Sequence, residues 1–406
     1  MSFGNYVACS VSVLLLIIPT CRSNVQCIFK ESSRSSDLDH LTRSLNIVDA
    51  ISSEEVTACI DQYKANISSL HIFSSFLTEL KPNSLTGATQ LNKLNITAQN
   101  LHTIHPQAID CNVITHIYGL YELHIKSSKL VALNEDQFKS CYQLRDVSFD
   151  GGELEFLSLD FIPEGSEYMR RLQIRNMPNL KTVSPLKANI TGSYLIENTG
   201  IEKLHPYMFA KNWVATQYIT FRNNPRLKVV PSHLLSGGYP NVDISFEGVP
   251  LEEFEPFFID DTKDMVRIYL GGHNIRHINK TVFEPIFKNW KNNASFIEWS
   301  TWGAPDLICD CSINWFASDD TLKQYIQAAE CEGVGPLDMV TADHFFHCFD
   351  CPSPDGLFSD PSECRYFYQC SAGRPYLKKC PDGLVFDASK QICEWPFNVQ
   401  GECGTK

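Results

Sequence analysis

Six cysteines near the end of the chain are placed to form three disulfide bonds. They are Cys351, Cys364, Cys370, Cys380, Cys393 and Cys403. They enclose aromatic residues, glycines and prolines in about fifty residues, which are too few to build an ordinary hydrophobic core. The sequence therefore predicts a small terminal domain that is held together by its disulfides.

The residues between these cysteines carry a family pattern. The text reads Cys351-Pro352, then Gly356 and Phe358, Cys364 to Phe367-Tyr368 to Cys370, Cys380-Pro381-Asp382-Gly383-Leu384-Val385-Phe386-Asp387, and Cys393-Glu394-Trp395-Pro396. It resembles the peritrophin-A type of chitin-binding domain across all six cysteines. The resemblance implies a small β-sheet with a hairpin and three disulfide bonds. These are Cys351–Cys370, Cys364–Cys403 and Cys380–Cys393.

The same resemblance implies a sugar surface on the hairpin and the rings near it. Chitin is an uncharged polymer of N-acetylglucosamine, so an exposed ring can cover a flat sugar face while a polar group bonds the acetamide. The expected contacts are Tyr376, Phe386, Asp387 and Trp395, with Tyr368 as a weaker candidate. A domain with so small a core must also bury rings to fold, and this structural role suits Phe358 and Phe367 better. For Tyr376 and Trp395 both roles stay open.

A repeat fills the long middle of the chain. An apolar pair with one residue between its members returns every 22 to 29 residues. The pairs are Leu70/Ile72, Leu94/Ile96, Leu123/Ile125, Val147/Phe149, Leu172/Ile174, Tyr194/Ile196, Ile219/Phe221, Ile244/Phe246 and Ile268/Leu270. This is the leucine-rich-repeat period. It predicts a leucine-rich-repeat solenoid with parallel strands on the inner curve, an irregular outer side and disulfide caps, followed by the small disulfide-rich β domain.

The polar position that usually bonds neighbouring repeats is irregular in this chain. An asparagine is common there, whereas this sequence offers Ser75, Gln99, Ser128, Gly152, Thr199, Asn224, Val249 and His273. Cys111 and Cys141 follow their apolar pairs by fifteen and sixteen residues, so they share nearly the same phase in neighbouring repeats. We therefore expect these two cysteines to be bonded, provided that their Cα atoms come within about 7 Å.

Cysteines also mark both ends of the repeat region. Cys309-Asp310-Cys311, Trp315, Cys331 and Cys348 resemble the C-terminal flanking cap of extracellular leucine-rich repeats. That resemblance implies the bonds Cys309–Cys331 and Cys311–Cys348, against a zinc site as the less favoured alternative. Cys27 and Cys59 are left to each other and would close an N-terminal cap. The predicted domains are 1–23, a signal peptide; 24–66, the N-terminal cap; 67–304, the repeats; 305–348, the C-terminal cap; and 349–406, the chitin-binding domain.

Several features predict a secreted glycoprotein of the extracellular, chitinous matrix. The apolar run of residues 11–19 has the length of a signal-peptide core. Cys9 and Cys21 would leave with that peptide, so an even set of fourteen cysteines would remain. Five glycosylation sequons, at Asn66, Asn95, Asn189, Asn279 and Asn293, fit secretion. A net charge of −13 without a basic cluster argues against binding to nucleic acid or anionic membranes.

The sequence favours binding over catalysis. The acidic pattern of barrel-type chitinases and the common zinc-protease and serine-hydrolase motifs are absent, so no catalytic residue, cofactor or metal site is predicted. His71 and His124 are expected to be surface residues of a polar inner face. That face suits an unidentified protein partner, but a solvated face of this composition also needs no ligand. The predicted function is a non-enzymatic chitin-binding adaptor. The alternatives are a stabilising, non-catalytic subunit of a secreted enzyme complex, as in a similar subunit of a shrimp luciferase, and a chitin-directed immune recognition protein.

Overall fold

The computed structural model describes most of the chain in two compact units. The described residues are 25–32, 42–64, 67–114, 119–133, 137–138, 140–160, 169–186, 190–209, 217–236, 241–260, 265–290, 294–299, 303–317, 319–340, 349, 351–361 and 363–405. The first unit, which we call the sheet unit, comprises the described parts of Met1–Arg276, Thr281–Asp306 and Gln324–Ala329. The second, the C-terminal unit, comprises those of His277–Lys280, Leu307–Lys323 and Glu330–Lys406. The predicted signal peptide lies outside the described residues.

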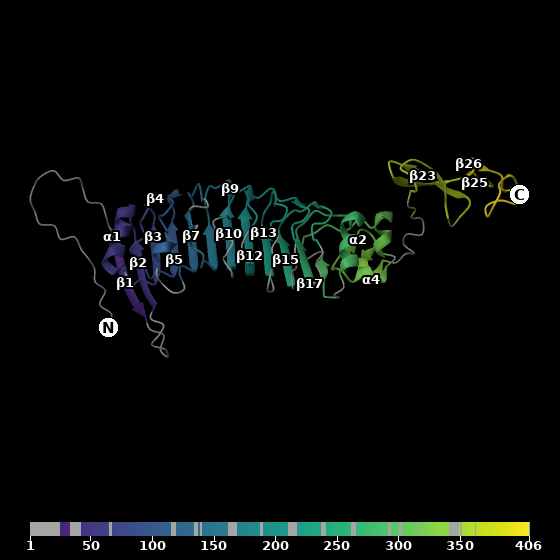
Figure 1. Cartoon of the computed structure of the whole chain (residues 1–406). Helices are drawn as coiled ribbons and strands as arrows, with labels where there is room; N and C mark the ends of the chain where they lie inside the picture. The colour runs from purple at the N-terminus through teal and green to yellow at the C-terminus, as the bar shows by residue number, and fades with distance from the viewer. Residues whose placement is uncertain are drawn as a thin grey trace, which may run out of the picture. The chain divides into compact units, whose positions relative to one another are not determined.

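One long sheet dominates the sheet unit (Figure 1). Within the described residues it has 13 strands in the order β1-β2-β3-β5-β7-β8-β10-β12-β13-β15-β17-β18-β19. The bounds are β1 Gln26–Ser32, β2 Thr42–Val48, β3 Ser69–Ser74, β5 Lys93–Ala98, β7 Glu122–Lys126, β8 Asp146–Asp150, β10 Met169–Met177, β12 Ile190–Thr199, β13 Gln217–Arg222, β15 Asn241–Glu247, β17 Met265–Gly271, β18 Phe296–Glu298 and β19 Ile326–Gln327. Only β1 runs antiparallel to its neighbour, so the predicted parallel sheet is present.

Shorter elements return the chain from one strand to the next. Three two-residue strand pairs run beside the long sheet: β4 Glu79–Leu80 with β6 Thr103–Ile104, β9 Phe156–Leu157 with β11 Thr182–Val183, and β14 Val229–Val230 with β16 Glu253–Phe254. The helices among the described residues of this unit are α1 Ser53–Tyr63, α2 Lys280–Asn289 and a short 3-10 helix at Cys111–Val113. These elements let each connection lie parallel to the connection before it.

The apolar pairs explain the register of the sheet. All nine predicted pairs lie on neighbouring strands and stand opposite one another, as Leu70 stands opposite Leu94 and Ile72 opposite Ile96. Every member of these pairs is buried. Side chains alternate between the two faces of a strand, so a pair separated by one residue faces the same side. A single strand could not shield its apolar side from water. Neighbouring strands with the same apolar pairs pack side by side and bury these side chains together.

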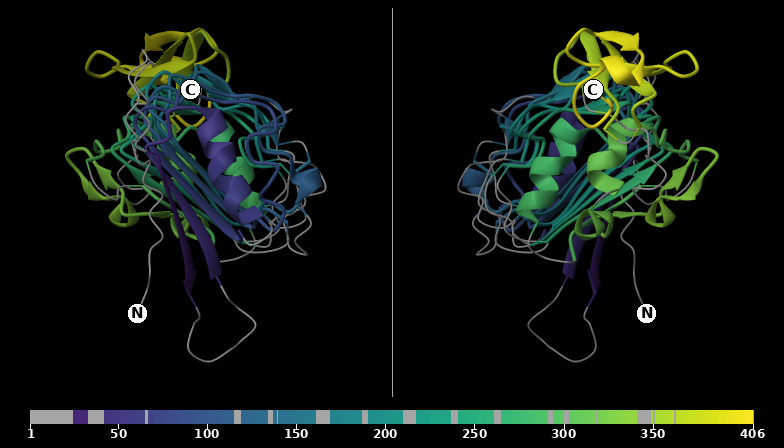
Figure 2. Two further views of the ribbon diagram at one scale, coloured as in Figure 1. Left: turned by 90° about the vertical axis from the view of Figure 1, so that its left-hand side faces the viewer. Right: turned by 90° about the vertical axis from the view of Figure 1, so that its right-hand side faces the viewer.

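The two ends of the sheet are closed by helices (Figure 2). Helix α1 begins after Ser52, whose side chain accepts a hydrogen bond from the amide of Glu55, and it buries Val56 and Ile60. The disulfide Cys27–Cys59 ties this helix to β1. At the other end, Phe283 of α2 packs against the rings of Phe254, Phe258 and Trp299. The closed ends limit how far the buried apolar face is exposed to water at either edge.

Polar side chains bond successive connections, some at the expected positions and some one residue earlier. Asn224 accepts hydrogen bonds from the backbone and hydroxyl of Thr199 and donates to the carbonyl of Ile196. His273 contacts the carbonyl of Trp299 at 2.6 Å in the same manner. Early in the sheet, the bonding residues are Ser74 and Ser127, each one residue before the expected Ser75 and Ser128. The expected Ser128 also bonds across, because its hydroxyl donates to the carbonyl of Gln99 at 2.8 Å.

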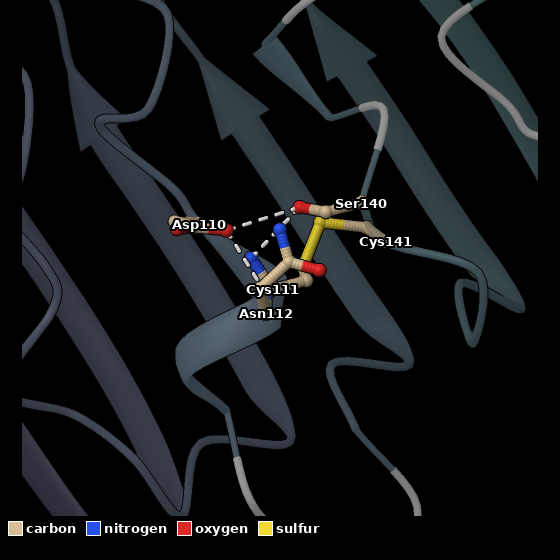
Figure 3. Close-up of a disulfide and its surroundings, with 5 residues drawn as sticks. All are labelled: Asp110, Cys111, Asn112, Ser140 and Cys141. Carbon is tan, nitrogen blue, oxygen red and sulfur yellow. Dashed lines mark hydrogen bonds between the residues drawn. A yellow bond between two sulfur atoms is a disulfide. The ribbon is translucent and has the colours of Figure 1, made fainter.

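The bond between Cys111 and Cys141 joins two adjacent connections (Figure 3). Their Cα atoms are 5.0 Å apart, within the range that a disulfide requires. Ser140 accepts a hydrogen bond from the amide of Cys111 at 3.1 Å, and it also contacts Asp110. The two cysteines that share a phase in the sequence thus meet in space.

Replacing both Cys111 and Cys141 with serine is expected to lower the free energy of unfolding of the sheet unit by about 3 kcal/mol. The bond closes a loop with a sequence separation of 30, and its loss frees that loop in the unfolded chain. Chemical denaturation followed by circular dichroism would measure the change. Ser140→Ala removes only the neighbouring hydrogen bonds and should cost about 1 kcal/mol. Equal losses in the two variants would contradict a distinct role for the cross-link.

The C-terminal unit combines short helices with small antiparallel sheets. Its elements are a 3-10 helix Cys311–Ile313, α3 Asn314–Ala317, α4 Asp320–Lys323, β20 Glu330–Cys331, β21 Gly335–Pro336, a 3-10 helix Leu337–Met339, β22 Gly356–Ser359, β23 Tyr366–Ser371, β24 Arg374–Lys379, β25 Val385–Asp387, β26 Ile392–Glu394 and a 3-10 helix Pro396–Asn398. Cys309 is bonded to Cys331. Cys311 is also disulfide-bonded, and its expected partner Cys348 lies outside the described residues.

Candidate functional site: a disulfide-fixed aromatic surface

Three disulfides fix the last small domain of the C-terminal unit. Strands β22, β23 and β24 form an antiparallel sheet, and β25 pairs with β26 in a separate hairpin. The bonds are Cys351–Cys370, Cys364–Cys403 and Cys380–Cys393, the pairs implied by the family resemblance. Cys380 follows β24 and Cys393 lies within β26, so the third bond ties the hairpin to the sheet. The domain can therefore hold side chains at its surface without a large core.

Two of the predicted contact rings lie inside the domain instead of on its surface. Phe386 is buried and stacks on Phe367 with ring centroids 4.6 Å apart. Tyr368 is buried on the other face of the sheet and stacks on Phe349 at 4.4 Å. Burial raises the pKa of Tyr368 to about 12. These rings supply the core of the domain, which corrects the expectation that they touch sugar.

Asp387 is also buried and shapes the turn of the hairpin. Its carboxylate accepts hydrogen bonds from the amide and hydroxyl of Ser389 and from the amide of Lys390. The hydrogen bond from the Ser389 side chain lowers the pKa of Asp387, so the carboxylate stays ionised. Asp387 therefore positions the hairpin through Oδ1, while Oδ2 pairs with the ammonium of Lys390 at 3.3 Å, and its direct contact with sugar stays a prediction.

Tyr376 is exposed on the edge strand β24. Its side chain is 49% exposed, and it stands opposite Gln369 of β23. Gln369 and Phe367 are separated by one residue and share a face of the sheet. Because Phe367 stacks on Phe386 of the hairpin, the hairpin packs on the same face that presents Tyr376. Tyr376 and the hairpin therefore belong to one side of the sheet.

Trp395 follows the hairpin directly, and it is held from two sides. The ring lies against Gly383, where an added Cβ would come within 3.1 Å of the indole and where the backbone φ is +85°. The carboxylate of Glu394 accepts hydrogen bonds from the amide of Trp395 and the side chain of Asn398. These bonds, led by the one from the Trp395 amide, lower the pKa of Glu394. The indole is nevertheless 50% exposed, so it can meet a flat ligand.

The structure reveals three exposed apolar side chains of this domain that the sequence interpretation missed. Phe397 lies two residues after Trp395, Ile392 lies on β26, and Leu377 lies on β24. Phe397 could have been noticed because only Pro396 separates it from Trp395. Ile392 offers no comparable signal, since it occupies a strand position that burial patterns usually fill.

The exposed face of the long sheet carries the predicted polar residues. The row comprises His71, Phe73, Asn95, Thr97, His124, Lys126, Ser148, Asp150, Gln173, Arg175, Glu197, Thr220, Arg222, Ser245, Glu247 and Tyr269, and of these only Ser148 is buried. Ion pairs cross between neighbouring strands, as in Lys126–Asp150 and Arg222–Glu247. Opposite charges thus compensate one another locally along this face.

The two predicted histidines of this face lie on separate strands, and His71 is within 2.9 Å of the hydroxyl of Ser69. Asn95 stands between His71 and His124 in the register of three strands. Partial burial lowers the pKa of both histidines, which keeps them neutral near pH 7. Among the residues described, no group of three histidine, cysteine or acidic side chains is placed to hold a metal ion. A search of the same residues finds no helix that is long and apolar enough to span a membrane.

Two predicted glycosylation sites fall within the described residues. Asn95 is half-buried on the exposed face of β5, and Asn279 is exposed just before α2. Asn66, Asn189 and Asn293 lie outside the described residues. The sequons therefore stay predictions.

The domain is small, it is fixed by three disulfides, and it keeps the rings of Tyr376 and Trp395 half exposed, an arrangement that suits contact with flat sugar rings. Residues 351–403 match the family described as "Chitin binding Peritrophin-A domain". The C-terminal domain is therefore a peritrophin-A chitin-binding domain.

Curated relatives share this short region. Peritrophin-1 of Anopheles gambiae is 35% identical over 51 residues, which are 13% of this chain and 33% of that protein. Endochitinase of Brugia malayi is 33% identical over 54 residues, or 13% of this chain and 11% of that enzyme. Protein obstructor-E of Drosophila melanogaster is 43% identical over 37 residues, or 9% and 15% of the two chains. The chain thus spans a third or less of the length of these relatives.

Proposed function

We propose that this protein is a secreted, non-enzymatic adaptor that its C-terminal domain anchors to chitin. The observation that carries the proposal is the pair of half-exposed rings, Tyr376 and Trp395, on one disulfide-fixed domain of a chitin-binding family. Each ring offers an apolar face to the flat side of N-acetylglucosamine, and the tyrosine hydroxyl adds a polar handle for the acetamide. Phe386, Asp387 and Tyr368 build the scaffold that orients these rings.

We assign the sheet unit to a leucine-rich-repeat solenoid, with the domain boundaries that the sequence predicts. Support comes from the apolar pairs that align strand by strand and from the polar bonds between successive connections, such as Asn224 with Thr199. In this arrangement the polar face of the sheet is free to bind a protein partner. Its locally compensated charges suit a polar protein surface better than a strongly charged polymer.

Secretion is part of the same proposal. The apolar run at residues 11–19 would direct export, and an oxidising compartment would allow the disulfides to form. The described disulfides occur in both units, which fits a protein that matures entirely outside the reducing cytosol. Glycans at the five sequons would be consistent with that route.

The proposal is tested by retention of the full-length, oxidised protein on chitin beads, with cellulose beads as the matched control. Chitin and cellulose share a backbone and differ in the acetamide group, so selective retention on chitin is expected. Proteins that are retained together with it from native secretions would then be identified. A stoichiometric enzyme partner would favour the role of a stabilising subunit. Recovery of the protein in the wash from chitin would refute the anchoring role.

A further inference from the structure

Phe397 is an exposed ring whose position needs an explanation. Its side chain is 61% exposed, which is more than either Tyr376 or Trp395. Phenylalanine has no polar group that can hydrogen-bond to water. This domain also has few apolar side chains, so an exposed ring is one that its small core does not use. Single exposed apolar residues are common on proteins, so exposure alone does not define a site. The relation of Phe397 to Trp395 supplies the second observation.

The two rings lie almost parallel. Their centroids are 6.1 Å apart, and their planes differ by 11°. Both rings are at least half exposed, so neither hides the other from solvent. An extended polymer of N-acetylglucosamine is a ribbon of sugar rings with similar orientation. The rings are stacked on one another, and because both stay exposed, each can contact one of two neighbouring sugars of a chain that runs past the pair.

The backbone holds this pair of rings in place before any ligand arrives. Pro396 separates the two residues and begins the short 3-10 helix Pro396–Asn398. The amide of Asn398 donates to the carbonyl of Trp395 at 2.8 Å, and the amide of Thr405 donates to the carbonyl of Pro396 at 2.8 Å. The fixed φ of proline and these two bonds limit the motion of the segment. Binding would then cost little conformational entropy.

We propose that Phe397 forms a second sugar subsite beside Trp395, so that the domain binds two neighbouring N-acetylglucosamine units of one polymer chain. This inference rests on the proposed function, in which Trp395 supplies the first subsite. It gives Phe397 a binding role that depends on ligand length. A merely structural phenylalanine would affect ligands of every length alike.

The test measures the affinity of the full-length protein for soluble N-acetylglucosamine oligomers of increasing length by titration calorimetry. For the wild-type protein, affinity should rise as the oligomer becomes long enough to reach both rings. Phe397→Ala should lose about three- to tenfold affinity for the longer oligomers and keep the wild-type affinity for the shortest one that binds. Phe397→Tyr should restore the gain with length, and Phe397→Leu, which keeps apolar bulk without a ring, should not.

A matched control is Phe156→Ala, because Phe156 is a similarly exposed phenylalanine of the sheet unit, 54% exposed. It should bind every oligomer as the wild-type protein does. Wild-type affinities for Phe397→Ala at all lengths, together with a loss in Trp395→Ala, would overturn the second subsite and leave chitin binding intact. An equal loss at all lengths would also overturn it. Absence of binding by the wild-type protein would refute both proposals.

Discussion

Trp395→Ala is expected to weaken retention on chitin by about thirtyfold, equivalent to roughly 2 kcal/mol of binding free energy. The indole is the larger of the two predicted contact rings, and it is already held by Gly383 and Glu394. Large, pre-positioned aromatic side chains at the centre of an interface contribute most to binding, because they bury much apolar area at little entropic cost. Depletion of the full-length protein by chitin beads at increasing bead concentration would measure the loss.

The paired experiment with Tyr376 asks whether the two rings act in one surface. Tyr376→Ala should also weaken retention, by a smaller factor, since the phenol ring lies at the edge of the domain. Tyr142→Ala is the matched control, because Tyr142 is an exposed tyrosine of the sheet unit, 56% exposed. It should be retained as the wild-type protein is. If Trp395→Ala and Tyr376→Ala were both retained like this control, the assignment of the sugar surface to this face would be wrong.

Much of the long sheet could be predicted because the spacing of apolar residues in the sequence determines which side of each strand is buried. Side chains alternate between the two faces of a strand, so Leu94 and Ile96 lie on the same face. That face must be buried whichever strand lies next to it. The recurrence of such pairs then dictates parallel stacking, since each strand needs a neighbour with the same pattern. The end strands follow no such rule. Strand β1, Gln26–Ser32, has no copy elsewhere and pairs antiparallel with β2, which the repeat could not reveal.

The candidate site was predictable in kind but not in detail. Residue type identifies Phe386, Tyr368 and Trp395 as rings that can stack on sugar. Residue type alone does not show which of these rings are buried in the small core. The stacking of Phe386 on Phe367 depends on how the hairpin folds back onto the sheet. The role of Asp387 in the turn could not be predicted, because its hydrogen bonds to Ser389 and Lys390 are invisible before the turn is known.

A second large effect is expected in the sheet unit, from Phe246→Ala. Phe246 is fully buried, and it stacks on Phe221 of the neighbouring strand with centroids 5.2 Å apart. The edge of Phe254 also meets the ring at 6.3 Å. Removing a buried phenylalanine loses its transfer free energy and leaves a cavity that the surrounding sheet closes only in part. The free energy of unfolding should fall by about 3 to 5 kcal/mol.

The control and the readout of this prediction separate the two units. Tyr218→Ala removes an exposed ring from the solvent side of β13 and should change the free energy of unfolding by less than about 0.5 kcal/mol. Denaturation would measure both variants, and chitin retention at low temperature should stay at the wild-type level in each. The small domain has three disulfides of its own, so its rings do not depend on the packing around Phe246. A stability of Phe246→Ala equal to that of Tyr218→Ala would show that the aligned pairs do not form the core. Loss of chitin retention in Phe246→Ala would instead show that the sheet unit contributes directly to binding.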